Sequence, residues 1–303
     1  MRSILSLTRN PQSKLVCRGA RGYATVSTAN ISVSPIAGAL GAEIGNVDLS
    51  SRLGHDTINA IRAAFLEHGV VFFRNQNLTP ARYLHFTSYF SKPIEYPFVR
   101  GISDEFPQII SVRKEPHETV NFGGIWHSDT SYFPQPPMGS VLMALEVPPY
   151  GGDTLFASQY MAFEALSAGL KESLSALKAV STSSKADASK TREDRIKDSG
   201  LKSDVLEAVH PVVRTHPETG RKSLYVNVAH TSRFEGWTEA ESAPLLDFLF
   251  QHQVKPEFTC RFKWNVGSIA FWDNRCVLHN PINDYHGHRR SMLRITLQGD
   301  TPR

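Results

Sequence analysis

The chain has 303 residues, of which 41 % are hydrophobic and 20 % are charged, and its formal net charge is +4. This hydrophobic content is enough for one large core or two modest ones, but no run approaches the roughly 18–20 apolar residues of a membrane span. Much of the positive charge lies before Glu43, so the remainder is close to neutral and does not indicate a nucleic-acid-binding surface. The three cysteines, Cys17, Cys260 and Cys276, are too scattered for a disulfide framework and indicate a reducing compartment.

The first 28 residues form a leader that is rich in arginine and serine and contains no acidic residue. Its basic residues are Arg2, Arg9, Lys14, Arg18 and Arg21. This composition is typical of a mitochondrial transit peptide, and the apolar stretch is too broken for a secretory core of about 7–15 residues. We therefore expect residues 1–28 to direct the protein to the mitochondrial matrix, with a tail on a cytoplasmic protein as the alternative. Residues 29–303 are expected to form a single domain.

Short strands and a few helices are predicted along the rest of the chain from the spacing of its apolar residues. In chain order they are a half-buried strand at 31–36, a short strand ending near 45, a helix at 55–67, a buried strand at 70–73, a helix at 79–90 and strands at 109–112, 140–147 and 154–157. They continue with a helix at 159–177, strands at 212–214 and 224–228, a helix at 238–252 and strands at 258–262, 268–272 and 292–297. The helix at 79–90 has a clear start signal, because Thr79 can cap its first turn and Pro80 suits its first position.

This order of elements predicts a mainly β fold with flanking helices. Many short strands without an internal repeat favour a sandwich or jelly roll over alternating βαβ units. Two largely polar segments, 92–124 and 182–204, interrupt the pattern. Long insertions of this kind in a compact domain are usually lids or surface loops, and closing loops exclude water from a site. We expect both segments to contribute active-site loops.

A candidate metal motif lies in the middle of the chain, where His127 and Asp129 stand two residues apart in the stretch 125–130. On an extended strand these two side chains would project from the same face. Two histidines and one carboxylate on one face of an octahedral iron leave its other positions open for substrates and oxygen. Taken alone, the pair also fits an ordinary polar pair at a strand edge, so the motif requires a second histidine elsewhere.

A second stretch supplies that histidine. His279 follows an apolar strand, and a histidine buried there needs a partner such as a metal. Arg290 and Arg294 stand four residues apart, just before and within the predicted strand at 292–297. On a strand, residues four apart face the same way, so both guanidinium groups could enter one cavity. Buried arginines require carboxylates, phosphates or similar anions, which indicates two anionic groups near the metal. For Arg294 the alternative is a structural arginine that pairs with an internal acid.

Taken together, these residues resemble the Fe(II)/2-oxoglutarate-dependent dioxygenases of the taurine dioxygenase (TauD/TfdA) family. The resemblance covers residues 31–300. Its most specific pieces are Trp126-His127-Ser128-Asp129, Gly151-Gly152-Asp153-Thr154, His210-Pro211-Val212-Val213-Arg214, Trp272-Asp273-Asn274-Arg275 and Arg289-Arg290-x-Met292-x-Arg294. It implies the fold of this family, a distorted jelly roll known as the double-stranded β-helix.

The resemblance also implies residue roles. Three side chains would bind Fe(II): His127, Asp129 and His279. The distal carboxylate of the cosubstrate 2-oxoglutarate would pair with Arg290 and accept a hydrogen bond from Thr154, and the anionic end of the primary substrate would meet Arg294. Oxygen would complete the reaction, with release of succinate and CO2. The stretch 272–274 would support His279 from behind, as metal sites require, whereas His210 and His216 are expected to be structural.

The expected substrate pocket departs from taurine dioxygenase proper. Tyr96, Val99 and Gly123 stand where the family has a pocket histidine, tyrosine and asparagine, so taurine itself is disfavoured. The stretch 221–227 and the following His230 resemble the branch that degrades aryloxyacetates. We therefore expect Tyr96, Gly123 and His230 to line the pocket, with a satisfied core histidine as the alternative for His230.

The predicted activity is oxidation, chiefly hydroxylation, of an sp3 C–H bond in a small anionic molecule, either a sulfonate or a carboxylate. Three alternatives stay open. The substrate could be an amino acid or an aryloxy or aromatic carboxylate, the outcome could be desaturation or cyclisation, or the protein could be a sensor that binds 2-oxoglutarate without turnover. No nucleic-acid or membrane partner is expected, and the sequence leaves open whether the chain forms a homo-oligomer.

Overall fold

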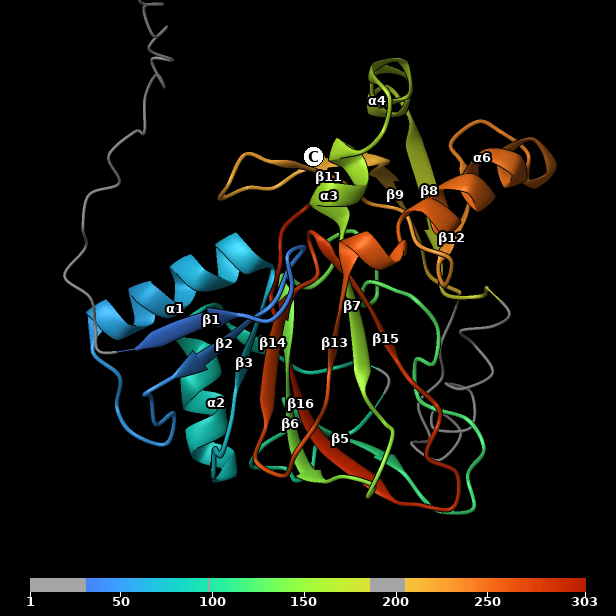
Figure 1. Ribbon diagram of the computed structural model, residues 1–303. Helices are drawn as coiled ribbons and strands as arrows, with labels where there is room; N and C mark the ends of the chain where they lie inside the picture. Colours follow the sequence, from blue (N-terminus) through green and yellow to red (C-terminus); the bar gives the residue numbers. More distant parts are fainter. Residues whose placement is uncertain (1–30, 98, 186–204) are drawn as a thin grey trace, which may run out of the picture.

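The computed structural model describes residues 31–97, 99–185 and 205–303 (Figure 1). The leader at 1–28 and most of the predicted loop at 182–204 lie outside the described residues. Among the described helices, none combines the length and apolar character needed to cross a membrane.

The largest sheet has eight strands and forms one wall of the core. Its members are β1 (Ser32–Pro35), β2 (Ala42–Gly45), β3 (Val70–Phe73), β4 (Pro93–Ile94), β5 (Ile109–Lys114), β6 (Gly139–Glu146), β14 (Ile269–Asp273) and β16 (Arg290–Leu297). The order is β1-β2-β3-β14-β6-β16-β4, with β5 also paired to β16. The two central strands β14 and β6 pair antiparallel through Ala270 and Leu142. Apolar runs such as Val70–Phe73 are fully buried because the sheet is covered on both faces.

A smaller sheet faces the large one across a buried apolar layer. It consists of β7 (Thr154–Ser158) between β13 (Thr259–Phe262) and β15 (Val277–Pro281). Phe72 of the large sheet stacks on Phe262 of the small one with ring centroids 4.0 Å apart. Phe156 and Trp272 meet across the same layer at 5.8 Å. Two sheets packed face to face, antiparallel apart from the β2–β3 pair, give the predicted mainly β architecture.

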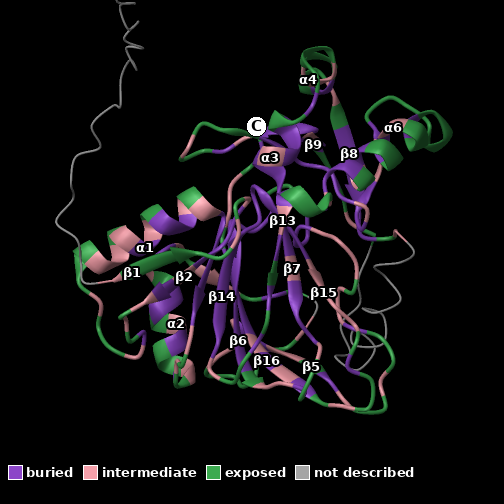
Figure 2. Cartoon of the chain, in the orientation of Figure 1, coloured by how far each residue is buried: buried purple, intermediate pink, exposed green. Residues whose placement is uncertain are grey.

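Two helices cover the outer face of the large sheet (Figure 2). They are α1 (His55–His68) and α2 (Pro80–Ser88), and their buried faces pack against β14, β6 and β16. Phe65 of α1 stacks on Phe271 of β14 at 4.0 Å. The predicted start of α2 is confirmed, because the Thr79 side chain accepts a hydrogen bond from the Arg82 amide and Pro80 is the first helical residue.

The remaining elements gather at one end of the sandwich, at the top of Figure 1. They are α3 (Gln159–Glu164), α4 (Ala168–Ser175), β8 (Lys178–Thr182), β9 (Glu207–Pro211), β10 (Val213–Thr215), β11 (Lys222–Leu224), β12 (Thr231–Phe234), α6 (Glu239–His252) and the 3-10 turn η1 (Pro256–Phe258). They form a three-stranded sheet in the order β12-β8-β9 and a two-stranded sheet of β10 and β11.

Three sequence predictions about elements are wrong. The predicted helix at 159–177 is two helices, because the Ser167 hydroxyl accepts from the Leu170 amide and caps a new helix. The predicted strand at 31–36 is present but fully exposed instead of half-buried, since it forms the edge of the large sheet. The predicted strand at 224–228 is misplaced, since β11 covers Lys222–Leu224 and residues 225–228 are not in a strand. His279 does follow a buried apolar strand, β14, and itself lies within β15.

Candidate active site

His127, Asp129 and His279 come together in the space between the two sheets. One ligand atom from each lies within 4.8 Å of the other two. The Nε2 atoms of His127 and His279 stand 3.6 and 3.8 Å from Asp129 Oδ1. These separations are longer than ordinary hydrogen bonds, and the three atoms face one common point. Two imidazoles and one carboxylate converging in this way form a donor set that suits Fe(II) and leaves positions for other ligands.

The local backbone differs from the predicted extended strand. His127 forms a single antiparallel bridge with His279, in which each amide donates to the other residue's carbonyl oxygen at 3.0 and 2.9 Å. The chain then turns, and Thr130 has a positive φ of 41°. Asp129 therefore reaches the site from a turn, and the bridge to β15 fixes the spacing of the two histidines.

His127 is oriented by its own neighbourhood. Its Nδ1 atom lies 2.7 Å from the Ile125 carbonyl oxygen, which can only accept, so Nδ1 carries the proton and Nε2 keeps a free lone pair. Gly123, whose φ is 71°, packs against the His127 ring. A Cβ atom at position 123 would stand 2.9 Å from His127 Cε1. Glycine is thus required here by both backbone and space.

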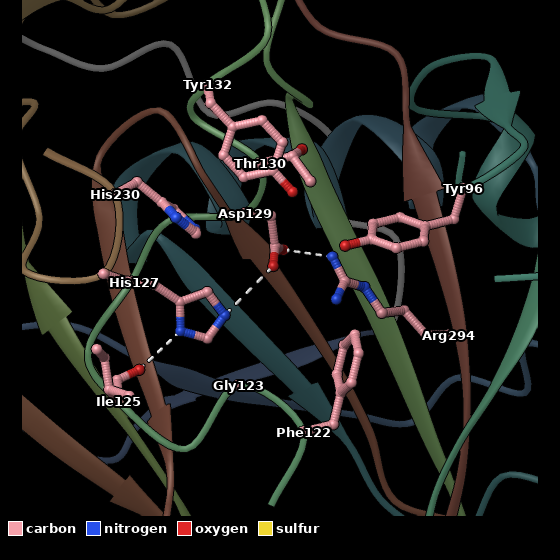
Figure 3. Close-up of a pocket in the computed structure, with 11 residues that line it drawn as sticks. Tyr96, Phe122, Gly123, Ile125, His127, Asp129, Thr130, Tyr132, His230 and Arg294 are labelled. Carbon is pink, nitrogen blue, oxygen red and sulfur yellow. Dashed lines mark hydrogen bonds and ion pairs between the residues drawn. The ribbon is translucent and has the colours of Figure 1, made fainter. Parts of the chain in front are cut away.

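Asp129 is buried, and its second oxygen is held by two donors, of which Figure 3 shows Arg294. Oδ2 accepts from the Ser140 hydroxyl at 2.8 Å and pairs with Arg294 Nη2 at 2.8 Å. Burial by itself would raise the pKa of the Asp129 carboxyl, but the charge of Arg294 and the contacts with His279 and His127 hold the pKa well below its usual range. The carboxylate is therefore ionised, and Oδ1 points toward the two histidines.

His279 is buried as well. Its burial, followed by the neighbouring His127, holds the pKa of His279 well below its ordinary value, so the ring is neutral and fit to bind a metal. Trp272 packs against it with ring centroids 4.6 Å apart. Trp272 is one of the three predicted supporting residues. Asn274 accepts from Trp272 Nε1 at 3.0 Å and from the Asp129 amide at 3.4 Å.

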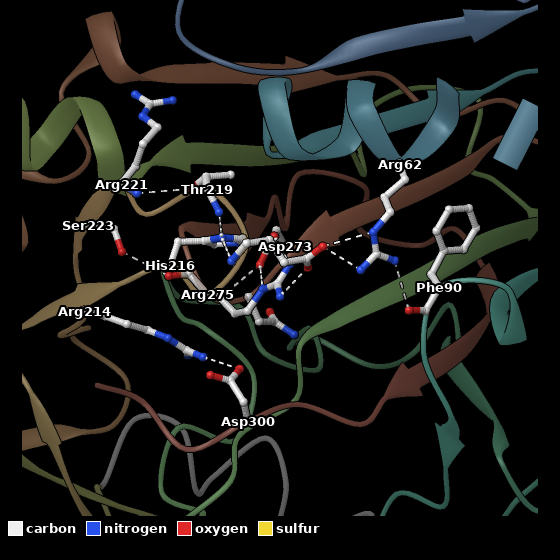
Figure 4. A network of polar contacts seen from close by, with 12 residues as sticks. Arg62, Phe90, Arg214, His216, Thr219, Arg221, Ser223, Asp273, Arg275 and Asp300 are labelled. Carbon is white, nitrogen blue, oxygen red and sulfur yellow. Dashed lines mark hydrogen bonds and ion pairs between the residues drawn. The ribbon is translucent and has the colours of Figure 1, made fainter. Parts of the chain in front are cut away.

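The third predicted supporter, Asp273, belongs to a separate buried network (Figure 4). It accepts from His216 Nε2 at 3.0 Å and from the Arg275 guanidinium at 2.7 and 2.8 Å. His216, Asp273 and Cys276 are also close enough together to hold an ion. However, His216 Nδ1 accepts from the amides of Glu218 and Thr219, and its Nε2 donates to Asp273. With both ring nitrogens engaged, this cluster is a structural network, as predicted for His216.

A cavity on the His279 side contains Thr154 and Arg290. Arg290 is 5 % exposed, and its Nε and Nη2 atoms have no hydrogen-bond partner within the described part of the chain. Burial lowers the pKa of Arg290 from its usual value. The Thr154 hydroxyl accepts from Trp264 Nε1 at 3.0 Å, so its own proton is free to be donated. A buried guanidinium and a hydroxyl donor that face a cavity form a site for an anion.

A second cavity opens on the Asp129 side (Figure 3). The predicted pocket residues Tyr96, Gly123, His230 and Arg294 all line it. Val99 does not; it packs behind Tyr96. The sequence did not single out the other lining residues, which include Phe122, Ile125, Thr130, Tyr132 and Ala229. Thr130 and Tyr132 could have been found because they directly follow the metal motif.

The two cavities adjoin at the three converging side chains. Phe122, His127 and Arg294 line both of them. Asp129 lines only the first cavity and His279 only the second. The arrangement therefore offers two anion-binding compartments that share one metal-binding position.

Comparison with known proteins agrees with this geometry. Residues 32–296 match the family described as "Taurine catabolism dioxygenase TauD, TfdA family". An alpha-ketoglutarate-dependent sulfate ester dioxygenase from Pseudomonas putida is 33 % identical, over 90 % of this chain and 91 % of that protein. The alpha-ketoglutarate-dependent 2,4-dichlorophenoxyacetate dioxygenase of Cupriavidus pinatubonensis is 32 % identical, over 89 % of this chain and 99 % of its own length.

A crystal structure of a taurine dioxygenase from Burkholderia xenovorans superposes with a TM-score of 0.77 and 36 % identity, covering 90 % of this chain and 91 % of that one. The predicted double-stranded β-helix is thereby confirmed. The cofactors of such enzymes are Fe(II), 2-oxoglutarate and O2, and the donor set described above fits the iron. The chain belongs to the TauD/TfdA family and is an Fe(II)- and 2-oxoglutarate-dependent dioxygenase.

Proposed function

We propose that His127, Asp129 and His279 bind Fe(II) and that the adjoining cavities receive the two organic substrates. The supporting observation is the convergence of these three side chains at the boundary between two cavities, each with a buried arginine. In the cavity next to His279, Arg290 and Thr154 hold the distal carboxylate of 2-oxoglutarate. In the cavity next to Asp129, Arg294 binds the anionic end of the primary substrate.

The bound iron, with 2-oxoglutarate and O2, supplies the oxidation of an sp3 C–H bond, with succinate and CO2 as by-products. The chain contributes orientation and exclusion of water. His127 presents Nε2 because Ile125 holds its Nδ1 proton, and the enclosed His279 is neutral. Two fixed anion anchors on one strand place both substrates at a defined distance from the metal.

The test of this assignment is succinate formation from 2-oxoglutarate with added Fe(II). We expect His127→Ala to lose metal binding and activity, because one of three ligands is removed. His85→Ala is the matched control, since His85 lies on the exposed side of α2, where it contacts Tyr89. Activity that survives the His127 substitution would contradict the assignment.

For the primary substrate, we propose a sulfonate, sulfate ester or carboxylate with an apolar or aromatic body. Tyr96, Phe122 and Tyr132 give the first cavity aromatic walls, while Arg294 supplies the cation. Taurine fits less well, because its ammonium group would need an acidic partner. Asp129 is the one acid among the described residues that line this cavity, and it is already engaged by Arg294 and the metal position. Relatives act on sulfate esters and on 2,4-dichlorophenoxyacetate, which share this plan.

A panel of taurine, an alkyl sulfonate, an alkyl sulfate, phenoxyacetate and an amino acid distinguishes these classes by substrate-dependent succinate release. We expect the apolar and aromatic anions to exceed taurine. Turnover of taurine alone would contradict the proposed class, and turnover of the amino acid alone would favour the alternative left open by the sequence. Product analysis separates hydroxylation from desaturation or cyclisation.

We also propose that the protein works in the mitochondrial matrix, on the basis of the basic, acid-free leader at 1–28. The test is the location of a fluorescent protein that carries residues 1–28 at its N-terminus, compared with a variant in which the leader arginines are replaced by glutamine. Cytosolic fluorescence from both would contradict import.

A further inference from the structure

The two oxygens of Asp129 have different surroundings. Oδ1 stands 3.6 and 3.8 Å from the Nε2 atoms of His127 and His279. Oδ2 points away from the histidines and is held by Ser140 and Arg294, each at 2.8 Å. The carboxylate is therefore fixed in one orientation, with one oxygen presented to the metal position and the other occupied by donors.

Ser140 is placed rigidly enough to set this orientation. It lies on β6 in the middle of the large sheet, opposite Trp272 of β14 and Thr296 of β16. Its relative exposure is 0 %. A residue hydrogen-bonded on both sides within a central strand has little freedom to move, so its short side chain has a fixed position.

The hydrogen bonds around Ser140 determine which way its proton points. Arg294 Nη2 lies 3.2 Å from the Ser140 hydroxyl oxygen, and an arginine can only donate. The hydroxyl oxygen therefore accepts from Arg294, and its own proton is left for Asp129 Oδ2. Arg294 donates to Asp129 as well, so the three side chains form a closed triangle behind the metal position.

We propose that Ser140 is a positioning residue that holds Asp129 Oδ2 and thereby reserves Oδ1 for the metal. This inference rests on the proposed role of Asp129 as an iron ligand. Arg294 is also the proposed anchor of the substrate anion, so its guanidinium serves two anionic groups. Ser140 is the neutral donor to Oδ2 that remains in place when Arg294 turns toward a substrate.

The test is the dissociation constant of Mn(II), measured by isothermal titration with the full-length apoprotein. Ser140→Ala should weaken binding by about 10- to 100-fold, the range known for partners of metal ligands. Ser128→Ala is the matched control. Ser128 is equally buried and adjacent to Asp129, but its hydroxyl donates to the Asn274 carbonyl oxygen at 2.8 Å instead of to the carboxylate. We expect Ser128→Ala to bind Mn(II) like the wild type.

A second variant separates weaker metal binding from a loss of folding. Ser140→Cys keeps nearly the same volume but replaces the hydroxyl with a weak donor, and Mn(II) favours oxygen ligands over thiols. It should also bind Mn(II) more weakly, while melting temperatures of the metal-free proteins report folding separately. Wild-type affinity in either folded Ser140 variant would overturn the inference.

The variant His127→Ala distinguishes a failure of the Ser140 inference from a failure of the proposed metal site. If the wild type binds Mn(II) no better than His127→Ala, the metal site itself is wrong. If His127→Ala loses binding and the Ser140 variants do not, the metal site stands and the role of Ser140 is refuted.

Discussion

Arg290 and Arg294 lie four residues apart on β16, yet their side chains have different environments. Arg294 pairs with Asp129 and Ser140, whereas Arg290 has two buried nitrogen atoms without a hydrogen-bond partner among the described residues. A buried guanidinium left in this way costs free energy unless a ligand completes its hydrogen bonds. Arg290 is therefore the more informative of the two for cosubstrate binding.

Substituting Arg290 by alanine should weaken binding of N-oxalylglycine, a compound similar in shape to 2-oxoglutarate, to the Mn(II)-loaded protein. A hydrogen bond to a charged group contributes about 1.5–3 kcal/mol, which corresponds to a roughly 10- to 100-fold higher Kd. Arg289→Ala is the control, because that neighbour is exposed and pairs with Glu115 and Glu146. Equal affinities for the two variants, measured by calorimetry, would contradict the assignment.

Much of the candidate site could be predicted from residue types alone. Imidazole, carboxylate and guanidinium groups carry their chemistry in the sequence, and all nine predicted site residues lie in or between the two cavities. Ser140 could not be predicted, because a serine on an apolar strand gives no sign of what its hydroxyl faces. Phe122 could not be predicted either, since its place between two cavities depends on how a loop folds.

At the scale of elements, the loop that carries Phe122 and Gly123 is fastened to the segment between His279 and Arg290. Asn121 is buried; its amide donates to the Pro281 carbonyl oxygen at 3.2 Å and accepts from the Tyr285 hydroxyl at 2.7 Å. Asn283 donates to the Thr119 carbonyl oxygen at 2.8 Å. These bonds hold the end of the predicted 92–124 segment in place, and closure of this loop over substrate stays a prediction.

Asn121→Ala should release this loop. Losing two hydrogen bonds of about 1 kcal/mol each would raise the population of the locally open state roughly 10- to 30-fold. Cleavage by a glutamate-specific protease after Glu118, followed by mass spectrometry, measures that opening. Asn77→Ala, an exposed change in another loop, should leave the rate unchanged. An unaltered cleavage rate in Asn121→Ala would show that the fastening lies elsewhere.

Among the elements, strands with continuous apolar runs were predicted well, whereas strands that contain polar residues were not. Val70–Phe73 and Ile269–Asp273 lie in the centre of a covered sheet, and their largely apolar composition predicts this burial. By contrast, β8 and β12 contain polar residues and gain their pairing from each other. The break between α3 and α4 depends on one serine cap, which helical spacing does not reveal.

At the scale of the whole molecule, a buried ionic network joins parts of the chain that are distant in sequence. Asp273 at the end of β14 binds Arg275 and His216, Arg275 pairs with Glu218, and Glu218 pairs with Arg62 on α1 (Figure 4). The side chains of Asp273 and Arg275 are 1 % and 4 % exposed. The network connects the large sheet, a covering helix and the hairpin of β10 and β11.

Removing the charge of Asp273 should destabilise the protein strongly. Asp273→Asn leaves Arg275 buried without its main counter-charge, and breaking such a pair costs about 3–5 kcal/mol. Urea unfolding measures this loss. Glu164→Gln, which breaks the exposed pair with Arg221, should cost at most about 1 kcal/mol. Similar unfolding midpoints for the two variants would show that the network contributes little.

Asp273 should also make the stability of the protein depend on pH. Burial would raise the pKa of Asp273, but Arg275 and His216 lower it below the ordinary value of 3.8. Its contribution to stability is therefore complete above the pKa of the unfolded chain, near 3.9, and is lost as the pH falls below that value. In Asp273→Asn the urea midpoint should depend less on pH between about pH 2 and 4 than in the wild type.

The backbone bridge between His127 and His279 has a consequence for how the protein folds. The two residues belong to distant parts of the chain, so their mutual hydrogen bonds form only when both segments have been brought together. Contacts between distant segments form slowly, because the intervening chain must first be ordered. With His127 and His279 as the proposed iron ligands, metal binding requires this contact between distant segments, so we expect a cell short of iron to hold a less stable pool of this protein.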